Sequence, residues 1–113
     1  MATVSASNSE WHSRLVLSNG NNEISATGTW NHDPNRDAHG PGGNGTPAGS
    51  DYDKPAPAGE GSLLARVNGG AIEHFSSGDP IRVTGPGHVD FKMNDNRHTD
   101  NLGSLEVAVT AVS

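Results

Sequence analysis

The sequence predicts an all-β protein built as a small antiparallel β-sandwich. Apolar residues recur at every second position in several short runs, and this alternation is typical of half-buried strands. Segments rich in glycine and proline, of which the chain holds 15 and 7, separate these runs. No run has the period of a helix, and strands joined in this way favour a sandwich. Because 113 residues make one domain, we expect a single domain over residues 1–113, with residues 1–9 prone to fraying.

The composition is compatible with a folded domain and limits the classes of partner that the protein can bind. Only 31% of residues are hydrophobic, but they cluster in the alternating runs, as expected for a sandwich with long polar loops. The net charge of −6 argues against nucleic-acid binding, which depends on basic patches. The chain has no cysteine, which excludes a disulfide, a thiolate zinc site and a cysteine nucleophile. We expect no membrane span and see no signal peptide, so the compartment stays open.

The first half of the chain predicts one hairpin and one long loop. Residues 3–6 are compatible with an edge strand, and residues 11–18 form the first clear strand. The Asn-Gly turn signal at residues 19–22 predicts a tight hairpin with a returning strand over residues 23–30. Residues 31–61 are too rich in proline and glycine for a helix or central strand, and a loop of this length is usually functional or disordered.

The second half predicts several short strands and a polar loop. Glycine-containing turns separate the expected strands, which cover residues 62–67, 71–76, 81–84, 88–93 and 105–112. The total is about seven or eight strands. Between the last two lies a segment, residues 94–101, with two carboxylates and three carboxamides. Trp30 stands at a corner between strand and long loop, where we expect it to pack in the core.

The polar segment predicts a calcium site. Calcium takes about six to eight oxygen ligands, and a loop crowded with side-chain oxygens supplies them. The ligands that we expect are Asp95, through both carboxylate oxygens, and Asp100 and Asn101, through one oxygen each, with backbone carbonyls completing the shell. The flanking strands and the spacing exclude an EF-hand. On spacing alone, an ordinary polar hairpin remains an equal alternative.

The other reactive residues give no catalytic pattern. None of the six histidines has the spacing of a zinc site, and no serine lies in a nucleophile elbow. His98 lies inside the polar segment, and because a neutral imidazole is a poor calcium ligand, we expect it to point outward to a bound molecule. We therefore predict that the protein is not an enzyme, with a glycoside hydrolase as the least favoured alternative.

Three segments resemble the bacterial calcium-dependent galactose-binding lectins of the LecA (PA-IL) family. They are Leu63-Leu64-Ala65-Arg66-Val67-Asn68-Gly69, Phe91-Lys92-Met93-Asn94-Asp95-Asn96 and Asp100-Asn101-Leu102-Gly103-Ser104-Leu105-Glu106-Val107. The earlier Ala26-Thr27-Gly28-Thr29-Trp30 resembles the family strand that leads to the first binding loop, and His39-Gly40-Pro41 resembles the turn of that loop. The likeness spans most of the chain from about Glu10 and is sharpest in the C-terminal hairpin.

This resemblance implies a jelly-roll β-sandwich, similar to a galactose-binding domain, whose single Ca2+ coordinates two vicinal hydroxyls of galactose. Carried over, Asp95 matches the bidentate aspartate, and Asp100 and Asn101 match a pair of asparagines. Backbone ligands would come from Asp33, three residues after Trp30, and from residues 97–99, where we take Thr99.

The chain departs from the family in a shorter hairpin loop, in Asp100 replacing asparagine, and in lacking a clear counterpart of the sugar-contacting His and Gln. Pro47 and Ser50 or Asp51 fall near those places. The candidate sugar contacts are His98, His39, Tyr52, Asp51 and Asn96.

Taken together, these expectations describe a calcium-dependent carbohydrate-binding lectin for galactose or galactosides. A single sugar held in this way binds weakly, so we expect a homo-oligomer that presents several sites. The alternative is a sandwich whose calcium is only structural and whose partner is another protein.

Overall fold

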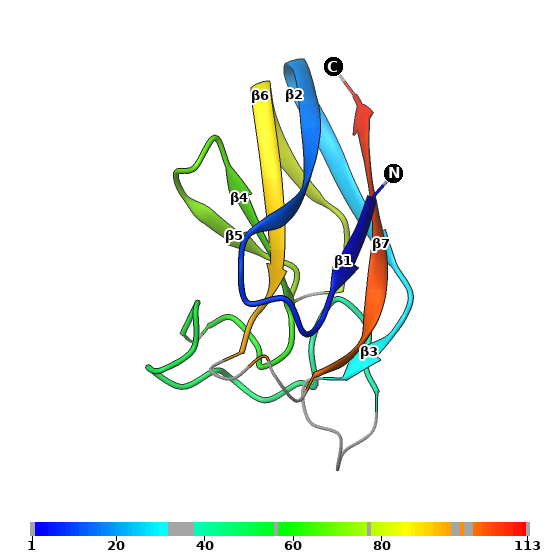
Figure 1. Ribbon diagram of the computed structural model, residues 1–113. Coiled ribbons are helices and arrows are strands. Elements are labelled where there is room, and N and C mark those ends of the chain that lie inside the picture. The colour runs from blue at the N-terminus through cyan, green and yellow to red at the C-terminus, as the bar shows by residue number, and fades with distance from the viewer. Residues whose placement is uncertain are drawn as a thin grey trace.

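The computed structural model of the chain describes residues 2–31, 38–55, 57–76, 78–95, 98 and 101–112. Within this part of the chain every regular element is a β-strand, which confirms the predicted all-β class. None of these residues belongs to a helix long and apolar enough to span a membrane. The strands are β1 (Ala2–Ser5), β2 (His12–Thr27), β3 (Trp30–Asn31), β4 (Leu63–Val67), β5 (Ile72–His74), β6 (Ile81–Met93) and β7 (Leu102–Ala111) (Figure 1).

The strands pair in the order β1-β7-β2-β6-β4-β5, and β3 adds to one end of β7. All of these pairings are antiparallel. The N-terminal strand β1 is fixed by this arrangement, since Ala2 pairs with Val107 and the side chain of Val4 is fully buried. Strands from the two ends of the chain therefore lie side by side.

The sheet folds over on itself through its two longest strands. Residues 12–17 of β2 pair with residues 87–91 of β6, and after a register shift residues 20–24 pair with residues 81–85. Figure 1 shows both strands turning back at the end of the molecule opposite the long loops. The first half of β2 thus lies in one layer with β4 and β5, and its second half lies in the other layer with β7 and β1.

This fold-over replaces the tight hairpin predicted at residues 19–22, and that prediction is wrong. The two halves of β2 do not pair with each other, since each pairs with β6. Asn22 is fully buried inside the bend, where its side chain bonds the backbone of Ser18 and Gly20. The turn expected at residues 85–87 also lies inside β6, directly opposite this bend. Gly85 is required there because a Cβ would overlap the carbonyl oxygen of Ser18.

The core lies between the two layers and draws on both sides of the bend. Leu17 and Ile24, from the two halves of β2, belong to one buried cluster with Val83 and Val89 of β6. Trp30 is 1% exposed, and its indole N–H donates to the carbonyl of Gly61 at 2.9 Å, which confirms that Trp30 packs in the core. Outside this cluster, Ala48 and Ala58 of the long loop and Leu64 of β4 are also buried.

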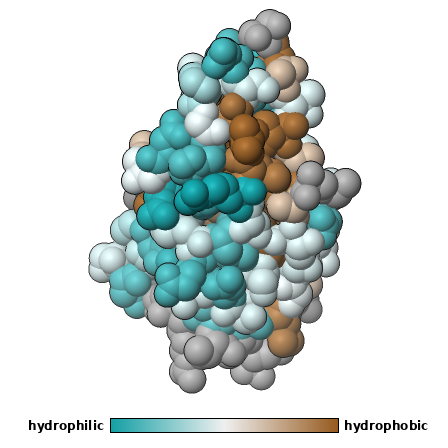
Figure 2. Space-filling view, turned by 45° about the horizontal axis from the view of Figure 1, so that its top comes forward, coloured by the Kyte–Doolittle hydropathy of each residue, from teal (hydrophilic) through white to brown (hydrophobic). Residues whose placement is uncertain are grey.

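The surface is mostly hydrophilic, with a localised apolar area. Figure 2 shows this area towards the upper end of the view, above a lower part that is mainly polar. Among the described residues the large apolar side chains left exposed are Val16 (80%), Leu102 (57%) and Val112 (37%).

Candidate functional site

The predicted calcium segment connects β6 and β7, at the end of the molecule where the long loops gather (Figure 1). The structure describes four of its residues, Asn94, Asp95, His98 and Asn101, and all four are buried. Four predicted site residues lie outside the described residues, namely Asp33, Asn96, Thr99 and Asp100. The four described residues form the buried part of the segment.

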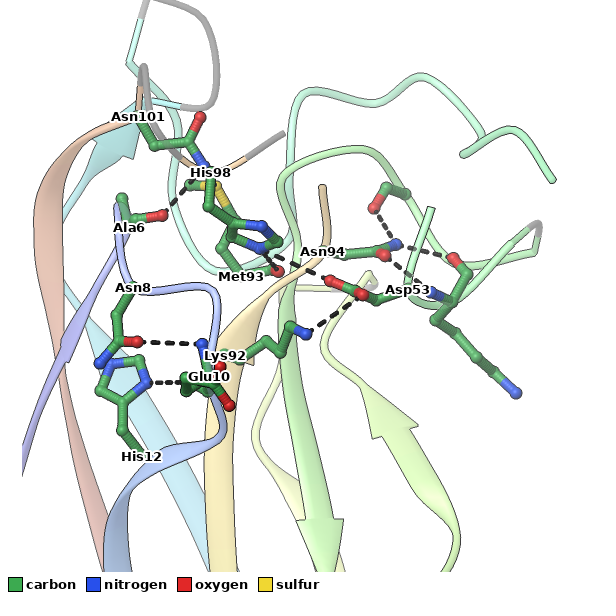
Figure 3. Close-up of polar contacts among 12 residues, drawn as sticks. Ala6, Asn8, Glu10, His12, Asp53, Lys92, Met93, Asn94, His98 and Asn101 are labelled. Carbon is green, nitrogen blue, oxygen red and sulfur yellow. Dashed lines mark hydrogen bonds and ion pairs between the residues drawn. The ribbon is translucent and has the colours of Figure 1, made fainter. Parts of the chain in front are cut away.

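Asn94 fastens the long loop to this base. Its side-chain amide donates to the carbonyls of Lys54 (2.8 Å) and Gly59 (2.9 Å), and its Oδ1 accepts the N–H of Lys54 (2.9 Å) (Figure 3). Its backbone bonds Gly61 and Ser62. Because every polar group of the side chain is used in these bonds, Asn94 is a clamp, a role that the sequence did not reveal.

Asp95 lies near the start of the segment and Asn101 at its end, and each residue is only 4% exposed. The amide group of Asn101 donates to the carbonyl of Ala6 at 2.9 Å and contacts Sδ of Met93 at 3.2 Å. Its Oδ1, however, has no hydrogen-bond partner among the described residues. Figure 3 shows this oxygen directed away from Ala6. Leaving a buried acceptor unsatisfied costs about 1–3 kcal/mol, so the position fits a ligand oxygen for a hard cation.

His98 does not point outward as expected. It is 8% exposed, and its Nε2 lies 2.8 Å from the carbonyl oxygen of Met93 and 3.5 Å from Oδ2 of Asp53 (Figure 3). Both neighbours are acceptors, so Nε2 carries a hydrogen and donates. The imidazole thus ties the segment to the end of β6 and to the long loop.

The long loop brings Tyr52 and Asp51 towards the same region. The hydroxyl of Tyr52 donates to the Glu60 carboxylate at 3.0 Å, and Asn44 donates to the other oxygen of Glu60 at 3.1 Å. Burial raises the pKa of Tyr52 above its ordinary value, and the bond to Glu60 raises it further. The charges of Asp95 and Asp51 act in the same direction, which shows that the phenol lies within electrostatic reach of the buried segment.

His39 lies at the other side of the loop region. It exchanges two backbone hydrogen bonds of 2.8 Å with Trp30, and its Nδ1 lies 3.2 Å from the carbonyl of Gly40. The predicted turn at residues 39–41 is therefore anchored to the core through Trp30. His39 is half-buried.

The structure also reveals Asp53, which the sequence analysis did not select. Its carboxylate lies 3.1 Å from Nζ of Lys92 and 3.5 Å from His98, and so joins the long loop to β6 and to the predicted calcium segment. No local signal identifies Asp53, because both partners are about forty residues away in the sequence.

Within the residues that the structure describes, no three histidine, aspartate or glutamate side chains converge as metal ligands. Two of the three predicted carboxylate or carboxamide ligands, Asp95 and Asn101, are nevertheless buried at the base of one loop region.

Comparison of the chain with models of known protein families gives no match, and comparison with curated proteins finds no similar one.

Proposed function

We propose that the protein is a calcium-dependent carbohydrate-binding lectin that takes galactose or galactosides. The observation that carries this proposal is the buried Oδ1 of Asn101, which has no hydrogen-bond partner among the described residues. A carboxamide whose N–H groups are both directed to fixed acceptors holds its oxygen in one orientation. Such an oxygen is suited to a calcium ion.

Asp95 supports the same assignment. A carboxylate that is 4% exposed carries a desolvation cost, which a bound divalent cation offsets. Asp95 and Asn101 would hold the calcium, with Asp100 and the carbonyls of Asp33 and Thr99 as the proposed remaining ligands. When bound, the calcium supplies positions at which sugar hydroxyls replace water.

The chain's own residues would then orient the sugar. Tyr52 and Asp51 come from the long loop, and the effect of Asp95 on the pKa of Tyr52 supports their proximity to the metal ligands. We propose them as sugar contacts, together with Asn96 and His39 from the sequence analysis. His98 is buried, and we assign it to holding the calcium segment in place.

We also propose that the protein acts as a homo-oligomer, because one such site binds a single sugar weakly and several sites on one assembly raise the avidity. Val16, Leu102 and Val112 are exposed apolar side chains at separate places, and each is a candidate for a contact between copies.

The test is calorimetric titration of galactose and of an α-galactoside into the protein with calcium and again with excess EDTA. Binding seen only with calcium, and lost in Asn101→Ala, supports the proposal. The matched control is Asn21→Ala, which removes an exposed carboxamide near the bend of β2 and should leave binding unchanged.

The remaining outcomes separate the alternatives. If calcium raises the melting temperature but no sugar binds, the calcium is structural and the lectin assignment is wrong. If the α-galactoside is hydrolysed, the protein is a glycoside hydrolase.

A further inference from the structure

One partly exposed aromatic side chain has no role in the proposed site. Among the described aromatic residues Trp30, Phe75 and Phe91 are buried, at 1%, 1% and 0% exposure. Only Trp11 and Tyr52 are half-buried. Tyr52 belongs to the candidate site, whereas Trp11 lies just before β2, on the layer formed with β6 and β4.

The ring of Trp11 lies over two cations. The guanidinium carbon of Arg66 is 4.6 Å from the ring centroid, and Nζ of Lys92 is 5.5 Å from it. The strand register pairs Arg66 with Asp90 and Leu64 with Lys92, so the side chains of Arg66 and Lys92 leave the sheet on the same face. Both cations therefore approach Trp11 from the same face of the sheet, and the half-buried ring keeps part of its surface exposed.

Three cations and two carboxylates lie beside the ring. Arg14 pairs with Asp90 at 3.0 Å, Arg66 lies 3.8 Å from the same carboxylate, and Lys92 pairs with Asp53 at 3.1 Å. Because each of these cations lies 3.8 Å or less from a carboxylate, the surface carries little excess charge. It offers an apolar ring bordered by polar groups. A pyranose has the complementary chemistry, since its C–H groups present an apolar face and its hydroxyls project from the edge.

This surface is continuous with the candidate site. Lys92 lies under the Trp11 ring and pairs with Asp53, and Asp53 also lies 3.5 Å from His98 of the calcium segment (Figure 3). Asp53 directly follows Tyr52 in the chain. The two partly exposed aromatic residues thus flank one ion pair.

We infer that Trp11 is a stacking platform for a second sugar, so that the protein takes a galactose-terminated oligosaccharide and not only a single galactose. The inference rests on the proposed function. Galactose occupies the calcium segment, and a sugar further along the same chain stacks on the outer face of Trp11, with its hydroxyls towards the Lys92–Asp53 pair.

The first test uses the intrinsic fluorescence of the wild-type protein. The chain has two tryptophans, and because Trp30 is buried, quenching by acrylamide reports mainly on Trp11. With calcium present, a galactose-terminated tetrasaccharide should reduce acrylamide quenching, whereas methyl galactoside should leave it unchanged. Equal quenching with and without the tetrasaccharide, at concentrations that saturate the protein, would overturn the inference.

The second test compares affinities by calorimetry. Aromatic contacts of this kind correspond to about a two- to tenfold gain in affinity, so the tetrasaccharide should bind more tightly than methyl galactoside by that factor. Trp11→Leu should abolish the gain without changing the affinity for methyl galactoside, and Thr84→Ala, at an exposed position of β6 away from both sites, should change neither value.

The titrations with the two sugars distinguish the stacking platform from the proposed lectin function. Equal affinities for both sugars in the wild type would refute the platform and leave the lectin assignment intact. No binding of methyl galactoside with calcium would refute the proposed function itself.

Discussion

Replacing Asn94 by alanine tests the clamp between the long loop and the calcium segment. The side chain is fully buried and makes three hydrogen bonds to the backbone of Lys54 and Gly59. A buried hydrogen bond contributes about 0.5–1.5 kcal/mol. Three such bonds predict that Asn94→Ala lowers the free energy of unfolding by about 2–4 kcal/mol.

Urea unfolding measures this loss, with calcium and with EDTA. Because the described contacts use both Oδ1 and the amide group of Asn94, the loss should be the same under both conditions. Hydrogen exchange provides a local readout, since the amide of Lys54 loses its acceptor and should exchange faster. Asn21→Ala, at an exposed carboxamide, should change stability by less than about 0.5 kcal/mol.

Two results would refute this reasoning. A loss below about 1 kcal/mol would mean that the three bonds contribute almost nothing. A loss seen only with calcium would mean that Asn94 acts as a metal ligand and not as a clamp.

Three further predictions follow from the bend, the loop and the metal ligands. Gly85→Ala should lower the free energy of unfolding in urea by at least about 2 kcal/mol, because its Cβ overlaps the backbone of Ser18. Gly70→Ala should be tolerated, because the nearest atom to its Cβ is 3.4 Å away, and equal stability of the two variants would refute the close approach at Gly85. Tyr52, the one tyrosine, has a pKa raised above its ordinary value of 10.0, so the phenol should stay protonated at pH 10 in an absorbance titration of the folded protein. Because Tyr52 ionises at a lower pH in the unfolded state than in the folded state, its contribution to the free energy of unfolding is complete below pH 10.0 and falls as the pH rises above that value. Tyr52→Phe should remove this fall, and a phenol that titrates at its ordinary pKa would contradict the burial. Asp95→Asn should weaken calcium binding about tenfold or more, seen as a smaller calcium-dependent rise in melting temperature, and an unchanged rise would exclude Asp95 as a ligand.

Much of the fold could be predicted from the sequence because alternation is a local property. The alternating runs at residues 62–67, 88–93 and 105–112 correspond to β4, the second half of β6 and most of β7. The bend could not be predicted in the same way. Asn-Gly and Gly-Pro-Gly are turn signals whether a strand reverses alone or together with a partner, and the partner here is more than sixty residues away.

The candidate site was predictable only in part, for the same reason. Asp95 and Asn101 are buried, as expected for side chains that bind a ligand inside the loop, but calcium binding itself remains a prediction. The roles of Asn94 and His98 depend on Lys54, Gly59 and Asp53, which lie far away in the chain. A side chain in a polar loop is expected to face solvent, and that expectation fails wherever a second loop covers the first.

The position of β7 has a consequence for biosynthesis. This strand lies between β1 and β2, so residues 2–5 have their pairing partner only once residues 104–107 have been made. During translation, β1 has no pairing partner until β7 has been made, and the second half of β2 lacks its neighbour on that side until the same point. Such distant contacts slow folding, and the nascent protein therefore completes its sheet only after synthesis of Leu102–Ala111.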